Sequence, residues 1–194
     1  EFLSTGELIE EFTLKRVSKR AAVFDYQKLT WLNGKYIREL PPEELTGEIE
    51  IFLQENKGTE LAREKITAIA ALLGPRIKVL TDFIDQADFI LSAEIEYDPA
   101  AVEKHLQKEG TVPLLRDVRS AVENLEDFTA EDLETALRGI IRDKEIKAGE
   151  LIHPLRIAVT GKTQSPGIFE TLILLGRDRV LNRLDKAITY ITSS

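Results

Sequence analysis

Apolar side chains recur at helical spacing through most of this 194-residue chain, and this periodicity limits the folds that it can adopt. One run has Leu61, Ile66, Ile69 and Leu72 at intervals that place them on a single helix face. The only hint of strand-like alternation lies at residues 90–97. The sequence therefore predicts an all-α fold built from two small packed helical bundles after a leading helical piece.

Two proline-containing boundaries, Pro41-Pro42 and Asp98-Pro99, divide the helical pattern. We expect a leading piece at residues 1–40 and bundles at 41–94 and 95–194. The pattern predicts helices at 59–73, 80–91, 99–109, 113–126, 130–144 and 148–159, one that starts at the Pro41-Pro42 boundary, and two more divided at Gly176.

Side-chain signals mark several expected helix ends. Ser4 with Glu7, and Thr129 with Asp132, have the spacing of N-terminal caps, and Asp25 can cap the next helix. We expect Asn33-Gly34 to interrupt that helix with a turn.

Composition excludes several classes of protein. The chain has no cysteine, which rules out disulfides, thiolate zinc sites and cysteine nucleophiles and fits a reducing cytosol. No apolar run approaches the roughly 18–20 residues that span a bilayer, and no signal-peptide pattern is present. Because the chain begins with Glu1 and has no methionine, we expect it to be a fragment of a longer protein.

Charge is distributed unevenly. Residues 1–38 carry seven Lys/Arg against five Asp/Glu, and residues 151–194 carry six against three. Since the net charge is −8, the middle of the chain carries −13. Anionic ligands should prefer surfaces built from the two ends, although solvated helix faces would also explain such an imbalance.

Two short motifs resemble phosphate-binding loops, but neither fulfils the requirements of one. Residues 17–20 (VSKR) resemble the KMSKS-type loop of class I aminoacyl-tRNA synthetases, but no nucleotide-binding fold precedes them. Residues 160–163 (TGKT) end like a P-loop, but Arg156 stands where that motif needs its first glycine.

The two histidines, His105 and His153, are expected to be far apart, and His153, which precedes Pro154, is expected to have a structural or surface role. No nearby serine completes a nucleophile pattern, and nothing supports a metal site. We therefore expect the chain itself to be non-catalytic, with no cofactor and no metal.

Segments near both ends of the chain resemble one known family. Residues 12–25 (FTLKRVSKRAAVFD) and 28–38 (KLTWLNGKYIR) are similar to the segment that follows the KMSKS loop in bacterial-type glutamyl-tRNA synthetases. Residues 155–161 (LRIAVTG), 165–170 (SPGIFE) and 174–176 (LLG) resemble a phrase from the C-terminal region of the same family.

The resemblance implies the layout and the activity of a longer parent enzyme. Residues 1–40 would complete the domain that contacts the inner corner of the tRNA, and 41–94 and 95–194 would be two anticodon-binding bundles. The parent would join glutamate to tRNA(Glu), using ATP bound in a catalytic domain outside this chain. That enzyme is expected to be a cytoplasmic monomer, with no membrane partner.

The resemblance also implies binding residues. Arg76 would read the third anticodon base, a cytosine, although a helix C-terminal arginine is also favoured by the macrodipole alone. The expected anticodon contacts are Arg76, Arg156, Ser165, Pro166 and Ile168. Weaker candidates for the tRNA backbone are Lys28, Trp31, Lys35 and Arg38. Of these, Trp31 is expected to lie in the core rather than to serve as a stacking platform.

A second interpretation remains open. A helical protein-interaction module without RNA contact would suit the acidic middle of the chain. The two differ in salt dependence, because RNA binding should weaken steeply as salt concentration rises.

Overall fold

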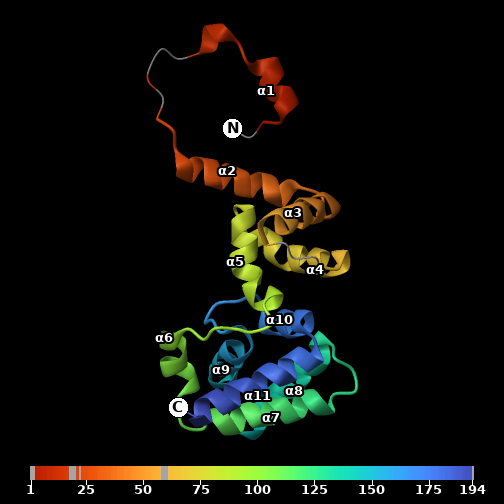
Figure 1. Cartoon of the computed structure of the whole chain (residues 1–194), viewed down its shortest axis with the longest axis vertical. Coiled ribbons are helices and arrows are strands. Elements are labelled where there is room, and N and C mark those ends of the chain that lie inside the picture. The colour runs from red at the N-terminus through yellow and green to blue at the C-terminus, as the bar shows by residue number, and fades with distance from the viewer. Residues whose placement is uncertain (1–2, 18–20, 22, 58–60, 194) are drawn as a thin grey trace.

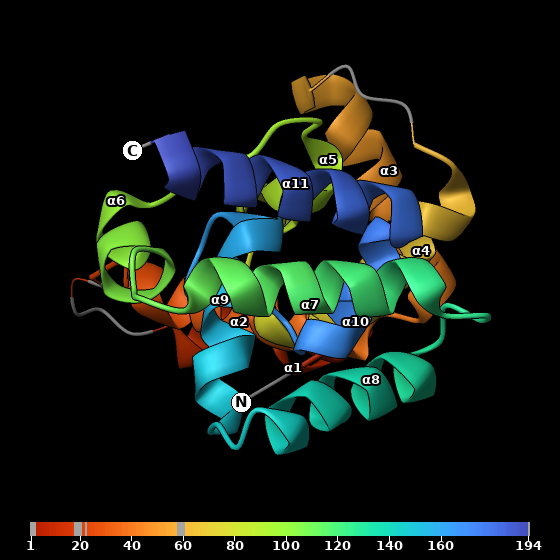
Figure 2. The same ribbon diagram turned by 90° about the horizontal axis from the view of Figure 1, so that it is seen from below.

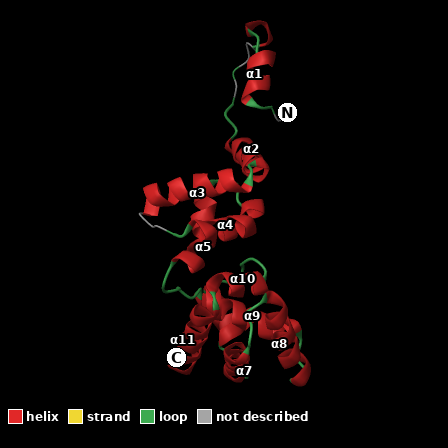
Figure 3. Cartoon of the chain, turned by 90° about the vertical axis from the view of Figure 1, so that its right-hand side faces the viewer, coloured by secondary structure: helices red, strands yellow, loops and turns green. Residues whose placement is uncertain are grey.

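The structure is a computed structural model that describes residues 3–17, 21, 23–57 and 61–193. Figure 3 shows helices joined by loops, and no strand occurs among these residues. In chain order the elements are α1 (Thr5–Glu11), η1 (Leu14–Arg16), α2 (Tyr26–Glu39), α3 (Pro42–Lys57), α4 (Arg63–Leu73), η2 (Gly74–Arg76), α5 (Leu80–Leu91), α6 (Pro99–Ala101), η3 (Val102–Leu106), α7 (Thr111–Asn124), α8 (Ala130–Asp143), α9 (Ala148–Thr160), α10 (Ile168–Leu175) and α11 (Arg177–Ser193).

The all-α prediction is confirmed, and most helices lie within a few residues of their expected bounds. The largest difference concerns the helix expected at 99–109. There the backbone leaves α6 after one turn and continues as the π-helical η3, which ends at Leu106.

The predicted N-terminal caps are all present. Ser4 and Glu7 form a reciprocal capping box, because each side chain accepts from the other residue's N–H. The Asp25 carboxylate accepts from the N–H of Lys28 at 3.0 Å, and the Thr129 hydroxyl accepts from that of Asp132 at 3.2 Å. Each cap provides a partner for one of the N–H groups that a helix start leaves unpaired.

The turn expected at Asn33-Gly34 is wrong, because α2 continues through both residues. Gly34 is buried where the segment after η2 crosses α2, and a Cβ there would lie 3.1 Å from the Cα of Lys78. The Asn33 amide donates to the carbonyl of Lys78 at 2.6 Å. Asn33 and Gly34 therefore permit a close crossing of two backbone segments. Glycine suits such a crossing as well as it suits a turn, because it has no Cβ.

The helices form two groups along the long axis of the molecule (Figure 1). In the first, α3 packs along α4, and α5 contacts both. In the second, α7 lies between α8 and α11, and Figure 2 shows α7 and α11 side by side. Contacts of α10 with α4, and of α9 with α5, join the two groups.

The N-terminal part differs from both groups in its exposed apolar surface. Figure 1 shows α1 away from the two helical groups. Of the residues described there, the exposed large apolar side chains are Leu8, Ile9, Phe12, Leu14, Val17, Val23, Phe24, Tyr26, Leu29 and Trp31.

The expectation that Trp31 lies in the core is wrong, since 54% of the surface of this residue is exposed. The buried residues of α2, Gly34 and Ile37, lie in its C-terminal half, and Trp31 lies one turn before Gly34 in the more exposed part of the helix. No helix among the described residues combines the length and apolar composition needed to cross a bilayer.

Candidate functional site

A cleft of about 390 Å³ lies where the two helical groups meet. We call it the central cleft. One side is formed by Arg76 of η2 and by the α5 wall, which consists of Asp85, Gln86 and Phe89. The other side is the loop wall between α9 and α10, which consists of Lys162, Gln164, Ser165 and Pro166. The cleft therefore joins segments that are far apart in the sequence.

Arg76 reaches the cleft because of the way α4 ends. The chain turns through the single 3-10 turn of η2, with Gly74 buried and Ile77 completely buried on either side of Arg76. These two anchors fix the backbone, and the arginine side chain between them is exposed. The structure thus places Arg76 on a rigid turn.

The loop wall is held by Arg156, one turn before the end of α9. Its Nη1 donates to the carbonyl of Pro166 at 2.7 Å, to the carbonyl of Ser165 at 3.2 Å and to the Ser165 hydroxyl. Hydrogen bonds from a charged donor are stronger than neutral ones, so this arginine sets the loop's shape.

Gly161 begins the loop with φ +75°, a conformation that favours glycine. Its carbonyl accepts from the N–H of Asp98 at 3.0 Å, which ties the loop to the connection between the two helical groups. The Thr160 hydroxyl bonds to the carbonyls of Arg156 and Lys162 and so closes the turn.

The electrostatics of the cleft favour an anion. Burial lowers the pKa of Arg156, and the positive charge of Arg76 lowers it further, which shows that the two guanidinium groups act on each other. Lys162 adds a third cation and donates to the carbonyl of Asp85 at 3.2 Å across the cleft. The two lining cations, Arg76 and Lys162, together with Arg156 behind the loop wall, outweigh the carboxylate of Asp85 and leave a net positive site in a chain of net charge −8.

The structure brings together some predicted residues and separates others. Arg76, Ser165 and Pro166 line the cleft directly, whereas Arg156 lies half-buried behind the loop. Ile168 is only 6% exposed, so its side chain contributes to the core of the second group.

The four weaker candidates lie outside the cleft, on α2. Their spacing of three, four and three residues places Lys28, Trp31, Lys35 and Arg38 on one side of a continuous helix. Arg38 and Pro75 line the same neighbouring pocket, so this α2 face ends beside η2 and Arg76.

Sequence reasoning missed the α5 wall, together with Lys162 and Gln164. Lys162 and Gln164 lie between two segments that resemble the synthetase family, 155–161 and 165–170, so only their position in the sequence pointed to them. Nothing in the spacing of Asp85, Gln86 and Phe89 separates them from other residues of an amphipathic helix. Their role depends on packing between the two groups.

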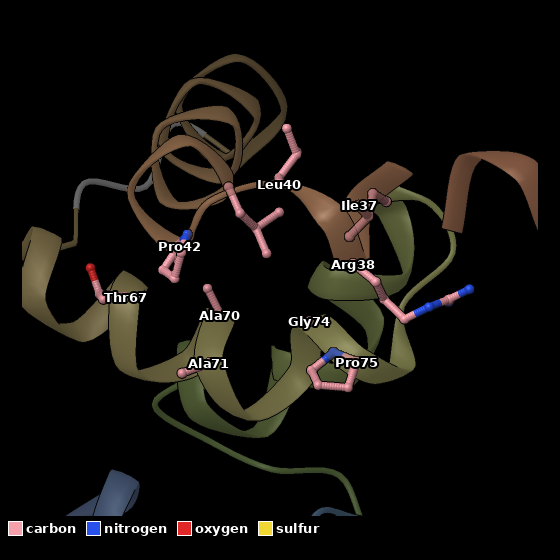
Figure 4. A pocket seen from close by; sticks show the side chains of 10 residues that line it. Ile37, Arg38, Leu40, Pro42, Thr67, Ala70, Ala71, Gly74 and Pro75 are labelled. Atoms are coloured by element: carbon pink, nitrogen blue, oxygen red, sulfur yellow. The ribbon is translucent and has the colours of Figure 1, made fainter. Parts of the chain in front are cut away.

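The pocket beside η2 has a volume of about 300 Å³ and is mainly apolar. Figure 4 shows Ile37, Leu40, Ala70 and Pro75 around it, with the Arg38 side chain extending away. It lies at the junction of α2, α3 and α4, and it offers few polar groups for chemistry.

The expectation that the two histidines are far apart is wrong. The rings of His105 and His153 lie in contact, with centroids 4.9 Å apart and planes tilted by 34°, because η3 packs against α9. They line a separate pocket of about 250 Å³ with Lys108 and Lys147. Burial lowers the pKa of His105, and the charges of His153 and nearby lysines lower it further.

Two further expectations concern catalysis and metals. Residues 18–20 of the VSKR motif lie outside the described residues. Among the described residues, no group of three or more His, Asp or Glu side chains is arranged to hold a metal ion.

Comparison with known proteins is consistent with this geometry. Residues 38–188 match the model of a family described as an anticodon binding domain. The chain is 36% identical to a glutamate–tRNA ligase of Moorella thermoacetica, over 98% of this chain and 40% of that protein. It is 35% identical to the glutamate–tRNA ligase of Thermus thermophilus, over 97% of this chain and 40% of that protein.

A solved structure with a similar fold is also that of a glutamate tRNA ligase. The glutamate tRNA ligase of Elizabethkingia meningosepticum is similar with a TM-score of 0.87 and 27% identity, over 97% of this chain and 37% of that one. The chain therefore spans about 40% of the length of the curated relatives that it matches. Because the family match takes in both sides of the central cleft and most of the chain, the chain belongs to the anticodon-binding domain family.

Proposed function

We propose that this chain binds the anticodon loop of tRNA(Glu) in the central cleft, as the anticodon-recognising part of a glutamate–tRNA ligase. The observation that carries the proposal is the cleft itself, where Arg76 faces a fixed loop wall between two helical groups. An anticodon is a single-stranded loop whose bases can be splayed out and read on their edges. A cleft with arginine, lysine and amide side chains is suited to that task.

The cleft residues would have different roles. Arg76 offers a planar group that can donate two hydrogen bonds to one base and reads the third base, a cytosine. Ser165 and Pro166 contact anticodon bases from the loop wall. Arg156 supports that wall, since its Nη1 already donates to it, and Ile168 supports it from the core.

The exposed face of α2 would contact the tRNA backbone. Lys28, Lys35 and Arg38 supply positive charge along one side of the helix. Trp31 is exposed between them and available for stacking on a base or sugar. This face leads toward η2, so backbone contacts and base contacts would follow one path.

The whole protein would join glutamate to tRNA(Glu), with ATP bound outside this chain, as a monomer in the cytoplasm. The supporting observations are the relatives' names and the apolar surface around α1 and the start of α2. Another domain of the same protein would cover that surface. No cofactor or metal is assigned to the chain itself.

The test is a titration of this chain with tRNA(Glu) and with a version substituted at the third anticodon base. Wild type should bind tRNA(Glu) more tightly, and binding should weaken steeply with salt. Arg76→Gln should lose discrimination worth roughly 1–3 kcal/mol, the size of one good base contact. Arg142→Gln is the matched control, because Arg142 is an exposed arginine of α8 that is absent from the cleft lining.

Two outcomes would contradict the proposal. If wild type and Arg76→Gln bind both tRNAs equally, Arg76 does not read the anticodon. If the chain shows no salt-dependent binding to tRNA at all, the protein-interaction module becomes the better interpretation.

A further inference from the structure

Arg183 of α11 is an unusual buried cation. Only 2% of its surface is exposed. Its Nη1 donates to the carbonyl of Val159 at 2.6 Å, and its Nη2 donates to the carbonyls of Phe89 at 2.6 Å and Ser92 at 3.1 Å. All three acceptors are main-chain carbonyls, so one side chain joins segments that lie far apart in the chain.

The chain can bury this charge because two helices end at it. Phe89 lies in the last turn of α5 and Val159 in the last turn of α9, where carbonyls have no partner within the helix. Helix C-termini carry a partial negative charge, so both ends favour a cation between them. Burial lowers the pKa of Arg183 to about 10, so the guanidinium remains charged at neutral pH.

Arg179, one turn earlier on α11, continues the same pattern. Its Nη1 donates to the carbonyl of Ile90 at 2.6 Å. Two arginines of α11 therefore satisfy successive carbonyls at the end of α5. This fixes the end of α5 against the second helical group.

The same contacts adjoin the central cleft. Phe89 belongs to the α5 wall, and Val159 lies just before the segment that forms the loop wall. Arg183 thus binds one carbonyl of the α5 wall and one carbonyl in the last turn of α9, from which the loop wall continues. The solvent-exposed hydrogen bond from the Lys162 ammonium to the carbonyl of Asp85 joins the loop wall to the α5 wall directly.

We propose that Arg183 is a positioning residue that sets the separation of the two cleft walls and thereby the selectivity for the third anticodon base. The inference rests on the proposed function, because it concerns the same cleft. It adds a residue that does not touch the tRNA. A planar fork is needed for this role, since a lysine ammonium has no rigid geometry with which to span both helix ends.

The first measurement concerns the cleft and needs no tRNA. Since the chain has no cysteine, spin labels can be placed at Thr81→Cys on α5 and Thr163→Cys on the loop, both exposed positions outside the cleft lining. Arg183→Met should shift or broaden the distance distribution between the labels. Leu133→Ala is the control. It creates a cavity at a fully buried position of α8 and should leave the distance distribution between the labels unchanged.

The second measurement is the ratio of affinities for tRNA(Glu) and for the version substituted at the third anticodon base. It is made at a temperature where circular dichroism shows each variant folded. Arg183→Met should lower this ratio at least about fivefold, the lower end of what one good base contact provides. Leu133→Ala should keep the wild-type ratio even if it is equally destabilised. If Arg183→Met does not fold, Arg183→Lys takes its place, with the same expectations.

The outcomes separate the two proposals. If wild type discriminates and the Arg183 variant keeps both the ratio and the label distances, the positioning role is wrong while the proposed function stands. If the distances change and the ratio does not, Arg183 shapes the cleft without setting selectivity, and the inference is likewise overturned. If wild type does not discriminate between the two tRNAs, both proposals fail.

Discussion

Gly161, where α9 ends and the loop wall begins, offers a sharp test of how tightly the cleft is built. Its φ of +75° and ψ of −8° lie in the left-handed region. A Cβ added there would overlap the carbonyl oxygen of Glu96 and lie 3.1 Å from the carbonyl carbon of the same residue. Because the obstructing group is backbone, the two segments would have to move apart.

The expected loss of stability has two parts. A left-handed backbone costs an L-residue roughly 1–2 kcal/mol. Overpacking of a closely packed site adds about 1–3 kcal/mol. Gly161→Ala should therefore lower the free energy of unfolding by about 2–5 kcal/mol. Because the displaced segment carries Lys162, the variant should also weaken tRNA binding.

Gly110→Ala is a matched control. Gly110 has φ +85° and ψ −9°, nearly the same backbone conformation, but no atom lies within 4 Å of the added Cβ. It should cost only the backbone part, about 1–2 kcal/mol. Urea unfolding followed by circular dichroism measures both variants. Equal losses in the two variants would refute the claim that contact with Glu96 makes position 161 special.

Two further predictions concern the loop wall and the histidine pair. Arg156→Met removes the charged donor to Ser165 and to the Pro166 carbonyl, which should lower the free energy of unfolding by about 1.5–3 kcal/mol and weaken tRNA binding. Urea unfolding measures the loss of stability, and unchanged tRNA binding in a variant that is destabilised would show that the loop needs no such support. Because the pKa of folded His105 lies below its ordinary value, the unfolded chain binds the proton more readily, so stability should fall as pH drops through about 6.5. His105→Gln should show a smaller fall between pH 7.5 and pH 5.5 in urea unfolding, and an identical fall would contradict the origin in His105.

Sequence periodicity predicts the helices well where burial on one face is decisive. The expected helix at 80–91 has the bounds of α5, whose buried Phe83, Ala87 and Ile90 follow helical spacing. The Asn33-Gly34 prediction fails for a physical reason. A glycine that permits a close backbone crossing has the same local signature as one that permits a turn, and only the position of Lys78 distinguishes them.

Some residues of the candidate site could be predicted from the sequence, and others could not. Ser165 and Pro166 could be named because they stand in a phrase that resembles a known family, and Arg76 could be named because that resemblance implies a role for it. The structure brings all three into one cleft. Arg183 could not be named, because nothing in its sequence surroundings shows that two helix ends meet there. Trp31 was misplaced because a large aromatic side chain suggests burial, whereas α2 is buried only further along, at Gly34 and Ile37.

The acidic character of the chain is consistent with RNA binding once charge is located in space. Screening at physiological salt limits exposed charges to a range of about 8 Å, so a ligand responds to nearby groups rather than to the net charge. The cleft lining has two cations and one carboxylate, with Arg156 adding positive charge behind the loop wall. The excess of acidic residues lies in the middle of the chain, with Glu43 and Glu44 in the first turn of α3 as examples. An RNA that approaches in other orientations meets carboxylates and is repelled. The negative charge elsewhere should therefore improve orientation without weakening the cleft, and neutralising Glu43 and Glu44 should increase nonspecific binding of RNA more than binding of tRNA(Glu).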